Sequence, residues 1–315
     1  MLRLVADLGI ADRIAPDGQI AIEALATACN VQSQSLIRVI RALAAFNVFT
    51  VTAGGIVAHT SRSRLLRTDT ENSLHHSARF WTAPGSWAAW DRLDVAMTGE
   101  IPHVAAWNMT RFDYLRAHLE EARGFDAMMA NSPDSHSAAV AAAYDFSRGS
   151  VIVDIGGGTG AVLRHILSHH PTQRGLLLDR DDVVRAIQSA DLLEGRIEVV
   201  GGSFFDAIPP GGDIYMLIRV LHDWSDEDCL RLLSGCRTAM KRDAVLLIGD
   251  QILEPDPAQG RAIDYLVDAQ MMAMFGNARE RTKDEFAGLL SASGFTLKRV
   301  IPTHSRVWIV EAAPS

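Results

Sequence analysis

Short apolar runs alternate with amphipathic segments along the second half of the chain. Five apolar runs have the length of a strand: residues 151–155, 175–179, 197–200, 213–221 and 244–252. Patterns with helical spacing lie between them. This rhythm is typical of an α/β domain with a parallel sheet and helices on both faces, because each parallel crossover needs room for a helix.

The chain ends on a different pattern. Two apolar runs, 296–301 and 306–312, lie too close together for a helical crossover. They must therefore pair antiparallel through a short turn. The helix before them has a clear predicted start, because Thr282 and Glu285 form a capping-box pattern. A parallel sheet that closes with an antiparallel hairpin argues against an ordinary dinucleotide-binding domain, which usually continues with parallel strands.

The first 70 residues have the pattern of short helices followed by a hairpin. Apolar positions over 4–14 indicate one amphipathic helix, a second begins at Ile22, and a third is predicted over 33–46. Two short strands are expected on either side of the glycine pair at 54–55, which is a hairpin signal. Three helices followed by a β-hairpin form a winged-helix pattern.

These patterns divide the chain into three predicted parts. Residues 1–73 are expected to form the winged-helix-like domain. Residues 74–147 are expected to form a helical connecting segment rich in tryptophan, phenylalanine and methionine, which covers the substrate. Residues 148–315 are expected to form the domain that contains the parallel sheet.

Composition narrows the classes of function. The 315 residues carry a net charge of −8 without a long basic run, so nucleic acid is not an expected partner. The three cysteines form no CxxC motif, and the histidines lack a metal-ligand spacing with acids, so neither a disulfide framework nor a metal is predicted. No apolar stretch is long enough to cross a bilayer, and we expect a cytoplasmic protein with no membrane partner.

The most informative segment is the strand predicted over 213–221, because it ends abruptly in His222, Asp223 and Trp224. Ligands of open α/β sheets bind just beyond the carboxyl ends of the strands. A histidine placed there can act as a base near neutral pH, and a tryptophan can stack on a flat ligand. On these residues alone, a structural histidine beside an aromatic plug explains the pattern equally well.

A glycine-rich turn follows the first strand of the predicted sheet. Gly156, Gly158 and Gly160 allow a tight turn and a close approach of the backbone to a nucleotide-like ligand. Their GxGxG spacing differs from the GxGxxG of dinucleotide-binding proteins. Asp179 closes the second strand, where a carboxylate can accept hydrogen bonds from both hydroxyls of a ribose.

Two residues after the third strand extend the predicted nucleotide pocket. Phe204 can lie against the face of an adenine, and Ser203 can meet the edge of the base. Considered by itself, Phe204 fits a core position better than a ligand contact.

The glycine turn, Asp179, GSFFD at 202–206, LHDW at 221–224 and RERT at 279–282 occur in the order of a known family. The chain resembles the S-adenosylmethionine-dependent small-molecule O-methyltransferases, which include plant caffeic acid and flavonoid enzymes and bacterial enzymes that methylate polyketide, quinone or phenazine products. The resemblance covers nearly the whole chain, and LHDW with RERT is more specific than the glycine turn. It implies a Rossmann-like class I methyltransferase domain preceded by a winged-helix-like domain, which forms a homodimer in that family.

The resemblance also implies a site for S-adenosylmethionine, with S-adenosylhomocysteine as the product. The positions that match the family's cofactor contacts are Asp154, Gly156, Gly158, Asp179, Ser203, Phe204, Arg219 and Trp224. The backbone of the glycine turn is expected to contact the methionine part. Arg219 stands where the family often has a lysine that touches the cofactor.

Catalytic and acceptor residues follow from the same resemblance. His222 matches the catalytic base, and Asp250 and Glu280 match two carboxylates that flank it. Asp250 is shorter than the glutamate common in plant members, so its contact to His222 is expected to be lost or mediated by water. The expected acceptor contacts are Phe125, Met129, Asp223 and Met271. The two methionines match residues that clamp an aromatic substrate.

The chemistry of methyl transfer defines the class of acceptor. The leaving thioether needs no proton, so the enzyme has to align two molecules and remove a proton from the acceptor hydroxyl. A carboxylate beside His222 raises the pKa of the imidazole and fixes its tautomer. A phenol or enol suits such a base, whereas an aliphatic alcohol is several pKa units more basic. We therefore predict O-methylation of a small aromatic secondary metabolite.

Three alternatives stay open at this point. The segment 24–46 has the pattern of a helix-turn-helix regulator, although residues 1–70 carry seven arginines against five acids, a small surplus for binding phosphates. A relative that keeps the cofactor could catalyse hydroxylation or decarboxylation, but the presence of His222 and Glu280 speaks against it. A nicotinamide-dependent dehydrogenase is disfavoured by the GxGxG spacing, the terminal hairpin and LHDW.

Overall fold

The computed structural model describes residues 1–70, 73–130 and 136–315, with the backbone alone for Met129 and Ala130. The chain divides into two compact units, an N-terminal unit and a sheet unit. They consist of Met1–Asp94 with His103–Ser135, and of Val95–Pro102 with His136–Ser315. The predicted connecting segment, 74–147, contributes residues to both units.

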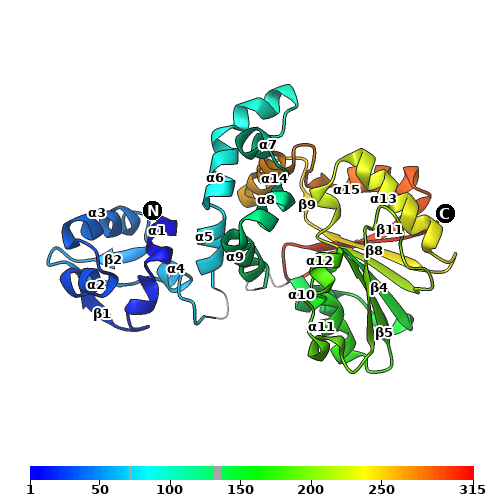
Figure 1. Ribbon diagram of the computed structural model, residues 1–315, viewed down its shortest axis with the longest axis horizontal. Helices are drawn as coiled ribbons and strands as arrows, with labels where there is room; N and C mark the ends of the chain where they lie inside the picture. Colours follow the sequence, from blue (N-terminus) through cyan, green and yellow to red (C-terminus); the bar gives the residue numbers. More distant parts are fainter. Residues whose placement is uncertain (71–72, 131–135) are drawn as a thin grey trace. The chain divides into compact units, whose positions relative to one another are not determined.

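The sheet unit is built on seven strands in the order β11-β12-β8-β7-β4-β5-β6 (Figure 1). Their bounds are β4 (Val151–Ile155), β5 (Arg174–Asp179), β6 (Ile197–Gly201), β7 (Ile214–Ile218), β8 (Val245–Asp250), β11 (Phe295–Ile301) and β12 (Trp308–Pro314). Strands β4 to β8 run parallel, and β12 pairs antiparallel with both β8 and β11. The predicted parallel sheet with a closing antiparallel hairpin is thereby confirmed.

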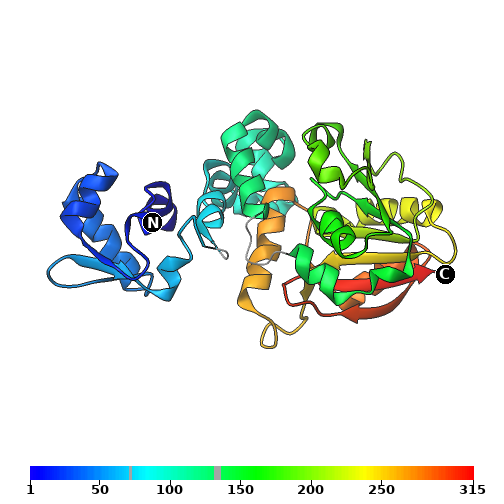
Figure 2. The same ribbon diagram turned by 90° about the horizontal axis from the view of Figure 1, so that it is seen from below.

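Helices cover both faces of this sheet (Figure 2). On one face, α13 (Asp226–Ala239) and α15 (Lys283–Ala292) bury leucines, cysteines and Phe286 against the inner strands. On the other face, α10 (His136–Ala143) and α11 (Ala161–His169) cover the same strands. Because β7 is buried along its whole length, it needs the continuous apolar run seen in the sequence.

The remaining elements of the sheet unit are short, apart from one helix. They are η3 (Phe146–Arg148), α12 (Asp181–Val184), η4 (Ser189–Leu192), η5 (Leu221–Asp223), β9 (Ile252–Leu253), α14 (Ala262–Phe275) and β10 (Arg281–Thr282). β9 and β10 form a separate parallel pair. The capping box predicted at the start of α15 is present, since Thr282 and Glu285 exchange side chain to backbone hydrogen bonds of 2.8 and 3.3 Å.

The first part of the N-terminal unit contains the predicted helices and wing. Its elements are α1 (Leu2–Asp7), η1 (Ala11–Arg13), β1 (Gln19–Ala21), α2 (Ile22–Cys29), α3 (Ser33–Ala44), β2 (Phe49–Val51), β3 (Ile56–His59) and α4 (Ser61–Arg64). Two expectations were wrong in detail. The helix expected over 4–14 ends at Asp7, because Gly9 adopts a φ of +61°. The wing is three-stranded, since β1 pairs with β3.

The second part of the unit is helical. Its elements are α5 (His75–Phe80), α6 (Pro84–Asp91), α7 (Pro102–Trp107), α8 (Arg111–Ala117) and α9 (Leu119–Ala130). The short helix η2 (Leu93–Thr98) begins in this unit and continues into the sheet unit, to which Val95–Pro102 belong. A small core of Phe80, Tyr114, Leu115 and Met128 holds these helices together.

Candidate active site

Two neighbouring strands bring the predicted halves of the site together. β4 and β7 pair in the middle of the sheet, with Asp154 opposite Met216. After β4 the chain adds β5 and β6 on one side, and then places β7 and β8 on the other. Ligands of open α/β sheets bind at such a switch point, outside the carboxyl ends of the strands. The glycine turn follows β4 there, and His222 follows β7.

The glycine turn exposes its backbone at this position. Gly156 and Gly158 have φ angles of +69° and +60°, a region that favours glycine. A Cβ atom on Gly158 would meet no heavy atom within 4 Å, so open space lies beside the turn. A Cβ atom on Gly156 would lie 3.0 Å from Val220 and 3.5 Å from Phe204. The turn therefore lies against the segments that follow β7 and β6.

Two carboxylates lie beneath and beside the turn. Asp179 accepts hydrogen bonds of 2.7 Å from the backbone N–H groups of Gly158 and Arg180. Asp154 is buried, and both of its carboxyl oxygens find no hydrogen-bond donor in the part of the chain that the structure describes. Burial and the nearby Asp179 raise the pKa of Asp154 to about 7. Unpaired acceptors beside an open backbone edge suit a ligand that brings its own donors and positive charge.

An aromatic cluster stands next to the turn. The Trp224 ring meets Phe204 and Phe205 edge-on, with centroids 5.7 and 4.7 Å apart. Both phenylalanines and Trp224 are partly buried and also pack on the sheet core. Ser203 is exposed, and its hydroxyl accepts from the backbone N–H of Phe205 at 3.2 Å. The structure thus brings Phe204 and Trp224 together in one aromatic surface, which packs on the sheet core and reaches the glycine turn through Phe204.

His222 lies in η5 and is bonded to a carboxylate from a distant part of the chain. Its Nδ1 lies 3.1 Å from Oε1 of Glu280, and both side chains are buried. Its Nε2 lies 3.5 Å from Oδ1 of Asp223. Burial and Arg219 act to lower the pKa of His222, but Asp223 and Glu280 outweigh them and raise it above its ordinary value. The arrangement is that of an imidazole oriented by an acid.

Arg219 shares this carboxylate. Its guanidinium donates to Oε1 of Glu280 at 3.3 Å. β7 ends at Ile218 rather than at residue 221, because Arg219 takes a left-handed conformation with a φ of +59° and its N–H donates to Gly249 at 2.7 Å. Burial alone would raise the pKa of Glu280, but His222 and Arg219 lower it to about 2. Glu280 is therefore a fixed anion near neutral pH.

Asp250, at the end of β8, is placed beside these groups without bonding to them. It is buried, and neither carboxyl oxygen has a hydrogen-bond donor among the described residues. Burial raises its pKa to about 7, against the lowering effect of His222 and Arg219. This agrees with the expectation that the shorter side chain loses a direct contact to His222.

Two residues that support Glu280 were missed in the sequence. The Glu280 N–H donates to Oδ1 of Asp268 in α14 at 2.8 Å. Arg281, which follows Glu280, is fully buried and reaches back to the segment around His222. Its place inside the RERT motif was a signal, but a motif does not reveal the partners.

The expected acceptor residues are distributed over both units. Asp223 is close to His222, and Met271 is buried in α14 of the sheet unit. Phe125 belongs to the N-terminal unit, where its ring lies 5.3 Å from that of Phe80. The side chain of Met129 lies outside the described residues.

Two kinds of feature are absent from the described residues. No group of three or more His, Cys, Asp and Glu side chains is arranged there to hold a metal ion. None of the helices described combines the length and the apolar character needed to cross a membrane.

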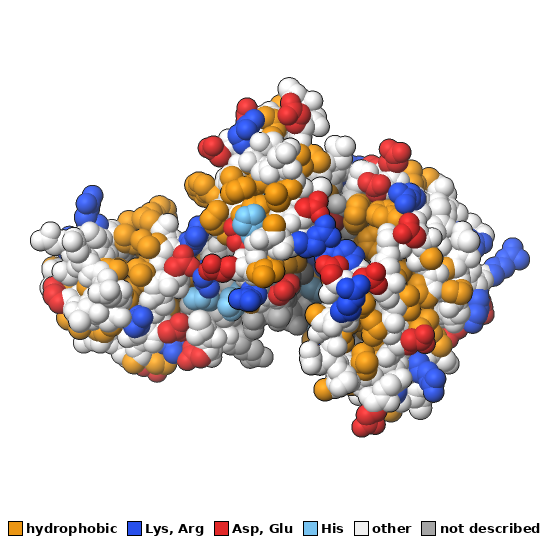
Figure 3. Space-filling model, viewed as in Figure 1, with side chains coloured by type: hydrophobic (Ala, Val, Ile, Leu, Met, Phe, Trp, Pro, Cys, Tyr) orange, Lys and Arg blue, Asp and Glu red, His pale blue; other side chains and the backbone are white. Residues whose placement is uncertain are grey.

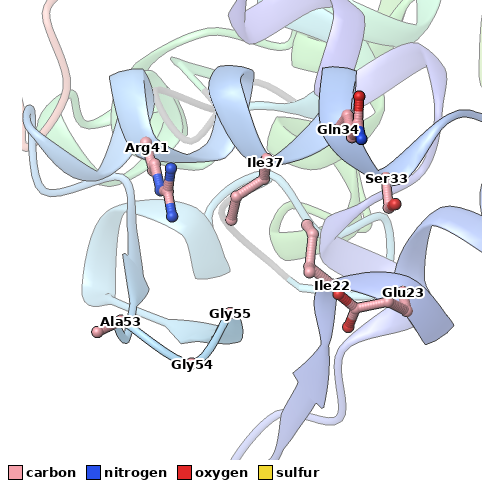
Figure 4. Close-up of a pocket in the computed structure, with 9 residues that line it drawn as sticks. All are labelled: Ile22, Glu23, Ser33, Gln34, Ile37, Arg41, Ala53, Gly54 and Gly55. Atoms are coloured by element: carbon pink, nitrogen blue, oxygen red, sulfur yellow. The ribbon is translucent and has the colours of Figure 1, made fainter.

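The N-terminal unit holds a hollow of about 310 Å³ between α2, α3 and the wing (Figure 4). It is lined by Ile22, Glu23, Ser33, Gln34, Ile37, Arg41, Ala53, Gly54 and Gly55. The charged side chains in this lining, Arg41 and Glu23, have opposite signs. On the face seen in Figure 3, the basic side chains of this unit are scattered among acidic ones. The hollow therefore offers no basic groove of the kind that phosphate binding needs.

Comparison with known proteins supports one family. A family profile described as an O-methyltransferase domain matches residues 90–296. The phenazine O-methyltransferase of Lysobacter antibioticus is 38% identical over 99% of this chain and 92% of its own length.

Solved structures agree with this match. A mitomycin 7-O-methyltransferase superimposes with a TM-score of 0.90 at 33% identity, covering 100% of this chain and 93% of the other. An O-methyltransferase of neocarzinostatin biosynthesis, solved with S-adenosylhomocysteine and 1,4-dihydroxy-2-naphthoic acid, superimposes with a TM-score of 0.82 at 28% identity, covering 100% and 95%. The predicted class I methyltransferase fold with its N-terminal helical domain is confirmed.

Proposed function

The chain belongs to the O-methyltransferase domain family and is an S-adenosylmethionine-dependent O-methyltransferase, and from that premise we propose that it methylates a phenolic or enolic hydroxyl of a small aromatic secondary metabolite. His222 is the general base. The observation that carries this proposal is the buried hydrogen bond between His222 and Glu280. His222 follows β7, and β7 pairs with β4, the strand that leads into the glycine turn.

The residues around the glycine turn fit the cofactor. When bound, S-adenosylmethionine supplies a methyl group on a positively charged sulfur. The unpaired carboxyl of Asp154 and the open backbone at Gly158 suit its amino acid part, and Asp179 suits its ribose. Phe204 and Trp224 would border the adenine, with Ser203 at its edge and Arg219 nearby.

Glu280 prepares His222 to accept a proton. With Glu280 ionised, Nδ1–H of His222 donates to it, which leaves Nε2 unprotonated, on the side where Asp223 lies 3.5 Å away. That nitrogen is thereby placed to accept the proton of the acceptor hydroxyl when the bound cofactor supplies its methyl group. Asp250 lies beside this pair without a hydrogen bond to it, and its raised pKa of about 7 makes it a weaker source of negative charge than Glu280.

The pKa of His222 is matched better to a phenol or enol than to an aliphatic alcohol. A phenol has a pKa near ~10 and free histidine near ~6.5, and each pKa unit of mismatch costs about 1.4 kcal/mol. Raising the pKa of His222 narrows this gap. An aliphatic alcohol would leave a gap several units wider, so it is a poor acceptor. The naphthoic acid bound to the neocarzinostatin enzyme is an aromatic hydroxy acid of the proposed class.

The organisation of the chain gives a second part of the proposal. Residues 1–73 form a dimerisation domain, 74–147 a segment that covers the acceptor, and 148–315 the cofactor domain. Asp223 and Met271, which both belong to the sheet unit, contact the acceptor. Light scattering on the purified protein tests the homodimer, and a monomer at working concentration would contradict it.

Product analysis tests the proposed reaction. The protein is incubated with S-adenosylmethionine and hydroxylated phenazines, naphthoates and benzoates, each paired with its saturated alicyclic alcohol. Mass spectrometry should find one added methyl group on aromatic hydroxyls and none on the paired alcohols. Hydroxylated or decarboxylated products would favour the alternative chemistry, and methylation of the alcohols would contradict the assigned acceptor class.

A further inference from the structure

Arg281 is the largest side chain that is fully buried in the described structure, and its guanidinium has no water-exposed face. All five of its N–H donors are engaged. Nε and Nη2 donate to Oδ1 of Asp226 at 2.9 and 2.7 Å. Nη2 also donates to the carbonyl of Trp224 at 2.8 Å, and Nη1 to the carbonyls of Leu221 and Arg279 at 2.9 and 3.3 Å. Such complete use of a planar fork fixes the relative positions of its acceptors.

Two of these acceptors stand on either side of the base. Leu221 is the first residue of η5, Trp224 is the capping residue directly after its end at Asp223, and His222 lies between them. Asp226 begins α13 directly after the turn. The side chain of Arg281 therefore holds the whole segment that carries His222.

The backbone of Arg281 holds the other partner of the pair. Arg281 pairs with Ile252 in the β9–β10 ladder, and Glu280 is the residue immediately before it. Glu280, whose carboxylate bonds His222, is thus the chain neighbour of Arg281, whose side chain binds the backbone around His222. One residue links two segments that are 58 positions apart in the chain.

We propose that Arg281 is a positioning residue for methyl transfer, which sets the distance between His222 and Glu280 by binding the backbone of the η5 turn. This inference rests on the proposed function of His222 as the base. Arg281 does not touch the reacting atoms in this account. It acts through the orientation of the imidazole, and through Trp224 it also supports the aromatic surface beside the glycine turn.

The substitution R281K tests this role, because lysine keeps the positive charge and loses the planar fork. R281K leaves the charged residues that surround His222, which are Arg219, Asp223, Asp250 and Glu280, chemically unchanged. We expect kcat to fall about tenfold or more while KM for S-adenosylmethionine changes less. The acid limb of the rate profile should move to lower pH, because His222 loses the full effect of Glu280. An unchanged kcat and pH profile in folded R281K would overturn the proposal.

Arg279 offers a matched control. It donates to the same aspartate, Asp226, at 2.8 Å and to Glu285 at 2.8 Å, but its side chain is bonded to these acids instead of to the turn. R279K should therefore keep kcat within about threefold of the wild type. An equal loss of kcat in R279K and R281K would assign the effect to the acidic partner, and would overturn the role of the turn carbonyls.

A double-mutant cycle with E280Q separates positioning from general stability. If Arg281 acts through the His222–Glu280 pair, R281K should add less than about threefold to the loss already caused by E280Q. If the loss of kcat in the double variant equals the product of the losses in R281K and E280Q, the proposal is overturned, even if H222A shows that His222 is the base. Full activity of H222A would instead remove the proposed function itself.

Should R281K fail to fold, D226N is the second variant, because it weakens the hydrogen bonds that the Arg281 guanidinium makes to Asp226. The acid limb of the D226N rate profile should also move to lower pH. An unmoved limb would overturn the proposal.

Discussion

His222 and Glu280 form a buried pair, in which Nδ1 of the imidazole lies 3.1 Å from Oε1 of the carboxylate. The two residues are 58 positions apart in the chain, and the fold brings them together: His222 follows β7, and Glu280 directly precedes β10. An ionised carboxylate on Nδ1 selects the tautomer whose Nε2 can accept a proton. The proposed base therefore has a defined orientation before any substrate arrives.

Removing the charge of Glu280 should slow catalysis. E280Q keeps the size of the side chain but no longer stabilises the imidazolium that forms when His222 takes the proton. General-base catalysis contributes roughly 10²–10⁴-fold, and we expect kcat to fall by about tenfold or more. Steady-state kinetics over a range of pH measure this effect. A kcat equal to that of the wild type would mean that the pair does not take part in proton removal.

The pH dependence of the wild-type enzyme should follow the raised pKa of His222. Only the neutral imidazole accepts a proton, so activity is lost as the pH falls through the pKa of His222. Because Asp223 and Glu280 raise that pKa above the ordinary value of about 6.5, the acid limb of kcat/KM should lie above pH ~6.5. E280Q should move the limb downward. A wild-type limb well below this value would contradict the electrostatic account.

Asp250 should matter less than Glu280. It is buried without a hydrogen-bond donor among the described residues, and its pKa is raised to about 7, so a neutral side chain resembles its protonated form. D250N should therefore lose several times less kcat than E280Q at pH ~7. Parallel kinetics on the two variants decide the point. Equal losses would show that Asp250 acts as a direct partner of His222.

Asp179 should contribute to cofactor affinity. Losing hydrogen bonds to a charged group costs about 1.5–3 kcal/mol, which corresponds to roughly 10- to 100-fold weaker binding of S-adenosylhomocysteine to D179A. Asp181, two residues later, has a side chain that is 65% exposed, so D181A is the matched control. Calorimetric titration of both variants gives the comparison. Similar affinities for D179A and wild type would exclude the ribose contact.

The sheet could be predicted from the sequence because its signals are local. The inner strands β4, β7 and β8 are short apolar runs, and the capping box of α15 needs only Thr282 and Glu285, three residues apart. Breaks in regular structure were harder to predict. Gly9 ends the first helix and Arg219 ends β7 through left-handed conformations, which an apolar pattern does not encode.

Only part of the site could be predicted from local patterns in the sequence. His222 and the glycine turn could be placed by general rules for strand ends. Glu280 and Asp250 required the family resemblance, since no spacing in the chain brings them to His222. The contacts of Arg281 depend on carbonyl groups 57 and 60 residues away, so they became visible only in the folded chain.

The most direct measurement for the central claim is the turnover of H222A with a phenolic acceptor that the wild-type enzyme methylates. It is combined with the affinity of H222A for S-adenosylhomocysteine. Loss of the base should lower kcat by at least about a hundredfold. Affinity for the product should stay within about threefold of the wild type, because His222 is not assigned to the cofactor contacts. Full turnover of H222A at neutral pH would contradict the assignment of His222 as the residue that removes the proton.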